Sequence, residues 1–109
     1  MSKYTIWQVR KSGLRDYGFR SLEAIRKSFP DQPGLPREAW EPVYVYDALR
    51  RPTLDGLYML FQRALGGTPE DFTGRSLSVS DIIETPEGDL FFCDSKGWKR
   101  VIWSEEATE

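Results

Sequence analysis

The chain has 109 residues and a mass of 12.6 kDa, which fits one compact domain with a single hydrophobic core. Hydrophobic residues make up 39% of it and aromatic residues 14%, so it has enough apolar surface to fold. A net charge of -2 and a pI of 5.2 argue against a dedicated nucleic-acid binder, because such proteins usually have a clear basic excess. We expect one domain over residues 1–103 and an acidic tail at 104–109 that frays.

Strand patterns occur at five places. Residues 3–10 and 42–48 alternate in a composition rich in β-branched and aromatic residues, and 76–85, 90–94 and 98–103 form a second group of β-rich segments. Both faces of 42–48 are apolar or aromatic, which predicts a central strand. The last three segments are joined by short turns and therefore predict an antiparallel three-stranded meander.

Helical patterns occur at two places. Residues 21–29 have an apolar face and follow Ser21, a suitable N-cap, and residues 54–65 have a wider apolar stripe and follow Thr53. Residues 68–72 have the composition of a single helical turn. Together with the strands, these patterns predict a small single-domain α+β fold in which an antiparallel sheet, ending in the meander, is packed by two helices.

The connections are predicted from glycine and proline. Residues 13–18 are irregular and polar, and residues 31–40 form a proline-rich, surface-exposed connection. Gly88 and Gly97 supply the positive φ that tight hairpin turns need.

The stretch GRSLSVSDII, residues 74–83, places serines at alternate positions and follows them with an acid. If it is extended, the serines share one face and the pattern breaks in a bulge or turn near Asp81. Alternatively, residues 79–81 form a tight turn and the strand begins only at Asp81. In either case no histidine is present to activate a serine, so the stretch is interpreted as the structural entry to the meander.

The residues needed for most catalytic sites are missing. The chain has no histidine, no phosphate-binding loop motif and a single cysteine, Cys93, so we expect neither an enzyme nor a cofactor site. Cys93 has no basic neighbour closer than Lys96, which favours a small structural side chain. The least favoured hypothesis is a metal-dependent enzyme that uses the carboxylates of Asp81 and Asp94, since scattered acids are commoner than metal sites.

Location and charge narrow the choice of partner. One cysteine excludes an intramolecular disulfide, and no apolar run approaches the ~20 residues that cross a bilayer, so we expect a cytoplasmic protein without membrane association. Residues 1–51 have a net charge of +4 and residues 52–109 a net charge of -6. The only basic cluster consists of Arg10, Lys11, Arg15, Arg20, Arg26 and Lys27. It is a candidate site for an acidic protein surface or for phosphates, although a solvated face is the simpler interpretation.

The second half of the chain resembles the YodL-like domain family, a group of small uncharacterised bacterial domains. The resemblance rests on LDGLYMLFQ (54–62), TPEDFTGRSLSVSDII (68–83) and FFCDSKGWKRV (91–101), in that order and at that spacing. It covers about residues 41–103, whereas 1–40 match only loosely. Arg75 stands where the motif commonly has a histidine, and Trp98 where a phenylalanine is usual.

The resemblance implies a domain found in Gram-positive bacteria, often on mobile elements, with a suggested link to the actin-like cell-shape cytoskeleton and no established catalytic residues. Our leading hypothesis is a non-catalytic module that binds a host or element-encoded protein. The candidate partner-binding residues are Ser78, Ser80, Asp81, Asp94 and Trp98. The alternative is nucleic-acid association through the basic first half and any exposed aromatic side chains.

Overall fold

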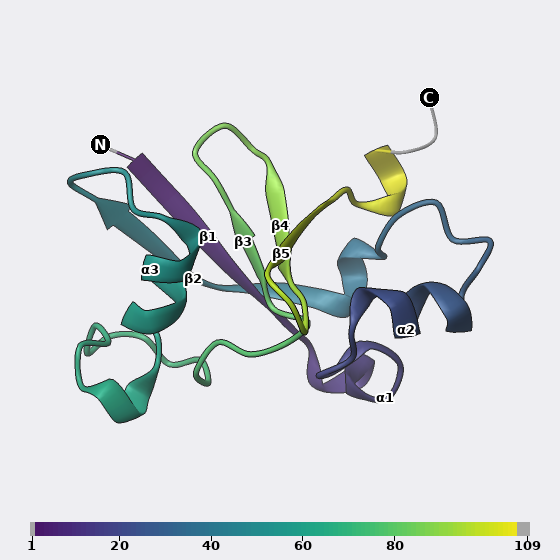
Figure 1. The fold of residues 1–109 in the computed structure, drawn as a ribbon, viewed down its shortest axis with the longest axis horizontal. Helices are drawn as coiled ribbons and strands as arrows, with labels where there is room; N and C mark the ends of the chain where they lie inside the picture. The colour runs from purple at the N-terminus through teal and green to yellow at the C-terminus, as the bar shows by residue number, and fades with distance from the viewer. Residues whose placement is uncertain (1, 107–109) are drawn as a thin grey trace.

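The computed structural model describes residues 2–106 as a small α+β domain built on a five-stranded antiparallel sheet (Figure 1). The strand order is β2-β1-β3-β4-β5. The strands are β1 Ser2–Val9, β2 Trp40–Ala48, β3 Ile82–Glu84, β4 Leu90–Cys93 and β5 Trp98–Val101. The helices are α1 Leu14–Tyr17, α2 Leu22–Ser28 and α3 Leu54–Leu60, and the 3-10 turns are η1 Lys11–Gly13, η2 Arg37–Ala39, η3 Arg63–Leu65 and η4 Ser104–Glu106. The predicted fold class is thereby confirmed.

The C-terminal strands form the expected meander. Gly88 and Gly97 have φ values of 92° and 71° in its two turns, as the hairpins require. β3 begins at Ile82 rather than at residue 76, so the serine-rich stretch before it is a loop and turn, close to the second of the two predicted arrangements. Ile82 and Ile83 are both fully buried, because β3 lies between two strands and has a core on each face.

The prediction of a central strand at 42–48 is wrong. β2 is an edge strand that pairs only with β1, and the side chain of Val45 is 53% exposed. The aromatic face of β2 is covered because the rings of Tyr44 and Tyr46 each lie 5.7 Å from the ring of Phe61, which follows α3. The apolar residues on both faces of β2 therefore reflect an edge strand covered on its aromatic face, and not central burial.

Both predicted helix caps are present. The hydroxyl of Ser21 accepts a hydrogen bond from the N–H of Ala24, and that of Thr53 accepts one from Gly56. α3 is shorter than predicted because the carbonyl of Phe61 accepts a hydrogen bond from the N–H of Leu77, a residue distant in sequence. The chain then continues as η3.

Three further expectations differ from the structure. Part of the stretch predicted to be irregular at 13–18 forms α1. Residues 68–72 form a hydrogen-bonded turn, from the N–H of Phe72 to the carbonyl of Pro69, and not a helical turn. The tail is ordered as far as η4, where Ser104 donates to the carbonyl of Leu35, and residues 107–109 of the predicted tail lie outside the described residues.

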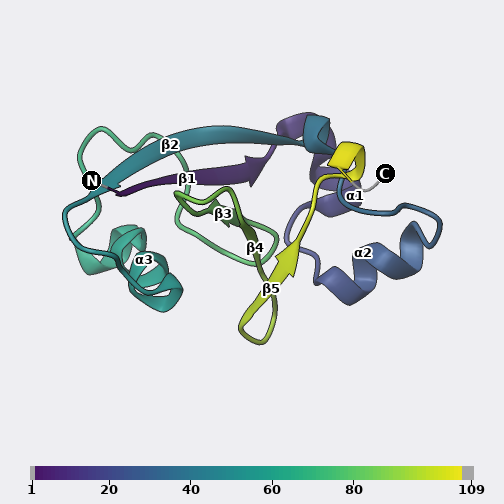
Figure 2. The ribbon, with the colours of Figure 1, turned by 90° about the horizontal axis from the view of Figure 1, so that it is seen from above.

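Two hydrophobic cores lie on opposite sides of the meander. The α2-side core includes Leu22 and Ile25 of α2 together with the rings of Trp7, Trp40 and Trp103, whereas the α3-side core is built around Phe61 and Phe72. Figure 2 shows the meander between α3 on one side and α1 and α2 on the other. Within residues 2–106 no helix has the length and apolar character needed to cross a membrane.

Candidate functional site

Ser80 and Asp81 of the serine-rich stretch are buried, so they do not form a partner-binding surface. The Ser80 hydroxyl accepts a hydrogen bond from the N–H of Phe19 at 3.0 Å, and its carbonyl accepts one from the indole of Trp40 at 2.8 Å. Ser80 has a φ of 85° and Phe19 a φ of 59°, and these are the only non-glycine residues in the described chain with positive φ. The hydrogen bond between them helps to stabilise both of these unfavourable backbone conformations.

The carboxylate of Asp81 is held by three donors in the interior. It accepts two hydrogen bonds from Arg75, at 3.0 and 3.2 Å, one from the backbone of Ser78 at 2.9 Å and one from Gln8 at 3.2 Å. Burial raises the pKa of Asp81 to about 6, against the opposing effect of Arg75. Because both carboxylate oxygens already accept hydrogen bonds, this arrangement serves the fold and is not a set of metal ligands.

The described residues contain no group of three or more acidic or cysteine side chains that could hold a metal ion. Cys93 is buried, and burial raises the pKa of its thiol to about 11, so little thiolate forms near neutral pH. The side chain of Cys93 is therefore placed to pack and not to react.

The remaining candidate residues occupy separate places. Asp94 accepts a hydrogen bond from the N–H of Leu22 at 3.2 Å, at the start of α2. Trp98 lies on the other side of the meander, where its indole donates to Asp55 at 2.9 Å. Ser78 is half-buried, and its hydroxyl has no hydrogen-bond partner among the described residues. The five predicted residues thus do not form one surface, because neighbours along the chain point to different sides of the sheet.

The six cations of the predicted basic cluster differ in their surroundings. Arg10 and Lys27 form ion pairs with Glu41 and Glu23, each at 3.4 Å. Arg20 donates to backbone carbonyls and to Ser28. Lys11, Arg15 and Arg26 are exposed and form no ion pair with another described residue. Of the six, Arg26 lines the groove described below.

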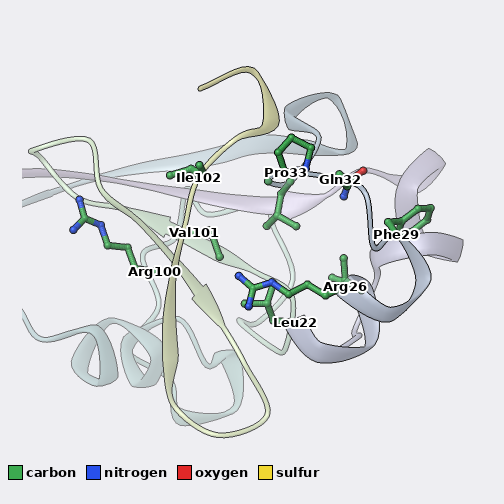
Figure 3. Close-up of a pocket in the computed structure, with 11 residues that line it drawn as sticks. Leu22, Arg26, Phe29, Gln32, Pro33, Arg100, Val101 and Ile102 are labelled. Carbon is green, nitrogen blue, oxygen red and sulfur yellow. The ribbon is translucent and has the colours of Figure 1, made fainter. Parts of the chain in front are cut away.

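A groove of about 410 Å³ lies between α2 and β5 (Figure 3). We call it the α2–β5 groove; its lining comes from three segments, namely Leu22, Ile25, Arg26 and Phe29 of the α2 region, residues 32–35, and residues 100–102. Leu22, Ile25 and Val101 are buried and belong to the α2-side core, so the groove opens directly onto that core. In Figure 3 the Arg26 side chain extends from α2 towards β5, whereas that of Arg100 points away from α2.

Close backbone contact fixes one end of the groove. The N–H of Leu35 donates to the carbonyl of Ile102 at 2.9 Å, and the N–H of Ser104 donates to the carbonyl of Leu35 at 2.7 Å. A Cβ added at Gly34 would lie 2.6 Å from the Ile102 oxygen, so only glycine allows this approach. At the other end, a neighbouring hollow shares Leu22 and Arg26 and continues the groove towards Lys99.

Comparison with known protein families identifies the family of this chain. The family model of the YodL-like domain matches residues 3–103, nearly the whole chain. The chain belongs to the YodL-like family. No curated protein and no solved structure matches it.

The match extends the resemblance seen in the sequence. It begins at residue 3 and therefore includes β1, α1 and α2, although residues 1–40 alone resembled the family only loosely. In this YodL-like domain, residues 68–83 supply the ion pair between the partly exposed Arg75 and the buried Asp81, and the α2–β5 groove is built from both the first and the last third of the match.

The groove itself was not predicted from the sequence. The apolar face of 21–29 and the strand at 98–103 were both recognised, and Arg26 belonged to the predicted basic cluster. Their proximity depends on the strand order, which places β5 at the edge beside α2, and on the return of the chain at Leu35. No local sequence signal marks either feature.

Proposed function

We propose that this YodL-like domain is a non-catalytic protein-interaction module that binds a peptide segment of a bacterial or mobile-element protein in the α2–β5 groove. The observation that supports it is a groove of about 410 Å³ that opens onto the apolar core and is flanked by Arg26, a cation that forms no ion pair within residues 2–106. Apolar hollows with a few polar groups at the rim are typical binding sites. The presence of this cation favours a partner segment that is acidic as well as apolar.

The proposal places the interaction in the cytoplasm, in keeping with the single buried cysteine. It also makes the Asp81 network a structural support of the domain and not a site of turnover. The buried carboxylate holds residues 75–81 against β1 through Gln8 and so positions the start of β3.

A peptide selection tests the proposal. A library of random dodecapeptides displayed on phage is selected against the whole domain, and recovered peptides are synthesised and titrated by fluorescence anisotropy. We expect peptides with Asp or Glu between apolar residues, and a loss of affinity of about tenfold in Arg26→Glu, the size of one favourable charge contact. Arg15→Glu is the matched control, because Arg15 is also exposed, helical and without an acidic partner, but lies outside the groove.

Two outcomes contradict the proposal. One is a selection that yields no peptide whose binding depends on Arg26. The other is tight binding of a single-stranded oligonucleotide at low salt that weakens steeply as salt rises, which would favour the nucleic-acid alternative.

A further inference from the structure

We propose that the partner segment binds as an added β-strand along the free edge of β5. This inference rests on the proposed function and specifies how the α2–β5 groove is occupied. Strand addition to an exposed sheet edge gives affinity through main-chain hydrogen bonds and specificity through alternate side chains.

The hydrogen-bond pattern of the meander shows which groups of β5 face outwards. Cys93 exchanges hydrogen bonds with residues 80 and 81 on one side of β4, and Asp94 donates to Gly97 on the other. Because hydrogen-bonded and non-hydrogen-bonded pairs alternate in an antiparallel ladder, Phe92–Lys99 is a bonded pair and Cys93–Trp98 is not. The N–H and C=O groups of Trp98 therefore point away from β4.

The same alternation applies to Arg100, whose backbone groups also point outwards. The next residue in phase is Ile102, and its carbonyl accepts the hydrogen bond from Leu35 on this outer side. Leu35 and Trp103 form an isolated parallel bridge, so the chain itself makes one residue of a sixth strand. No described residue bonds to the outward backbone groups of Trp98 and Arg100. The free part of the edge thus lies beside the groove, directly before this bridge.

The charges select an acidic partner over a second copy of the chain. Lys99 is exposed, lies on the α2 side of the edge and forms no ion pair with another described residue, and Arg26 shares the neighbouring hollow with it. Antiparallel pairing of two β5 strands would place Lys99 and Arg100 near the same cations of the second copy, which is unfavourable. Because every second side chain of a strand points to the same face, the α2-facing positions of the partner strand must include both kinds of residue: apolar side chains that enter the groove and carboxylates that reach Lys99 and Arg26.

The other edge of the sheet is unsuited to strand addition. β2 contains Pro42, which has no N–H to donate, and its register with β1 shifts between Ile6 and Trp7, so that Val43 is bulged. Proline and bulges are devices that block edge pairing. β5 has neither.

The test uses a dodecapeptide recovered from the phage selection. In amide hydrogen exchange followed by ¹⁵N NMR, we expect the peptide to slow exchange at the Trp98 and Arg100 amides at least tenfold. In an added strand, every second N–H of the peptide faces β5 and the others face away. We therefore prepare two peptides, one N-methylated at the odd-numbered amides and one at the even-numbered amides. We expect one of them to lose at least tenfold in affinity and the other to lose less.

Two variants separate the backbone from the side chain of the edge. Arg100→Pro removes an outward N–H without breaking the ladder to β4, and we expect it to abolish peptide binding while the amide spectrum stays folded. Arg100→Ala removes the same side chain, with its Asp89 pair, but retains the N–H, and we expect binding within about threefold of wild type.

The outcomes distinguish this inference from the proposed function. Peptides that depend on Arg26 but leave the Trp98 and Arg100 amides unprotected, and bind Arg100→Pro as well as wild type, overturn strand addition and leave the module intact. If no peptide depends on Arg26, the proposed function fails, and strand addition fails with it.

Discussion

The two sides of the meander are closed in different ways. On the α3 side, Phe61 is fully buried, and the rings of Tyr44, Tyr46 and Phe72 surround it. On the α2 side, three tryptophans fill the depth of the core, but Phe29 at the end of α2 is only partly buried and lines a groove.

The difference follows from the segment after each helix. The chain after α3 passes back over the sheet, so Phe61 and Leu77 are joined by a backbone hydrogen bond and the core is sealed. The chain after α2 contains three prolines between residues 30 and 36 and runs along the far side of the groove without filling it. One side of the described domain is therefore closed by packing, whereas the other keeps an open groove.

The largest expected effect is on the closed side. Phe61→Ala should lower the free energy of unfolding by about 4 kcal/mol, because it deletes a fully buried ring and leaves a cavity. Phe29→Ala on the open side should cost only about 1 kcal/mol, since that ring is partly exposed. Urea unfolding followed by tryptophan fluorescence measures both. Equal losses would show that the two sides do not differ in packing.

The ion pair between Arg75 and the buried Asp81 should give the next largest effect. Arg75→Ala should destabilise the domain by about 3 kcal/mol at pH 7, because it leaves the carboxylate of Asp81 without its cation in the interior. Adding Asp81→Asn to this variant should recover part of the loss. A double variant less stable than Arg75→Ala alone would contradict this account.

The pH dependence of stability should be smaller. Burial raises the pKa of Asp81 to about 6, so the folded state holds this proton more tightly than the unfolded state. The contribution of Asp81 to stability is therefore greatest below about pH 4 and falls as the pH rises through about 6, by about 2 kcal/mol. Urea unfolding of wild type and Asp81→Asn from pH 4 to 7 isolates this contribution, and we expect the stability of wild type relative to Asp81→Asn to fall as the pH rises. A rise in that relative stability would refute the assignment.

The smallest effect on stability is expected at the cations of the open side. Arg26→Glu and Lys99→Glu should each change the free energy of unfolding by less than about 0.5 kcal/mol, since both side chains are exposed and neither forms an ion pair in the described part of the chain. Lys96→Glu, in the exposed turn before β5, is the control for Lys99→Glu. A stability loss above about 1 kcal/mol in either variant would mean that the open side is also structural, and any loss of peptide binding could not then be assigned to charge.

Much of the local structure could be predicted from the sequence. The caps at Ser21 and Thr53 and the turns at Gly88 and Gly97 depend on residue types within a few positions, so they are predictable. The local predictions that are wrong fail because of contacts between residues distant in the sequence. α3 ends early because of a hydrogen bond from Leu77, a contact between residues far apart in the chain.

The candidate site was predictable only in part. Alternation places Ser78 and Ser80 on one face if the stretch is extended, but a turn with positive φ buries Ser80 and directs its hydroxyl to the backbone N–H of Phe19. The sequence predicts Asp81 as a partner-binding residue, because it does not show that the side chains of Arg75 and Gln8 converge on this carboxylate. Burial of a charge depends on partners, and these partners come from separate parts of the chain.

The sequence alone determined the α+β class, the absence of histidine chemistry, the helix caps and the family. These follow from composition, from patterns with a period of two or of three to four residues, and from motifs at fixed spacing. The tertiary structure decided that β2 is an edge, that Asp81 is internal and that a groove opens beside the free edge of β5. Strand order and the return of residues 34–35 to residue 102 are long-range arrangements, set by how two cores pack against one sheet and not by any local pattern.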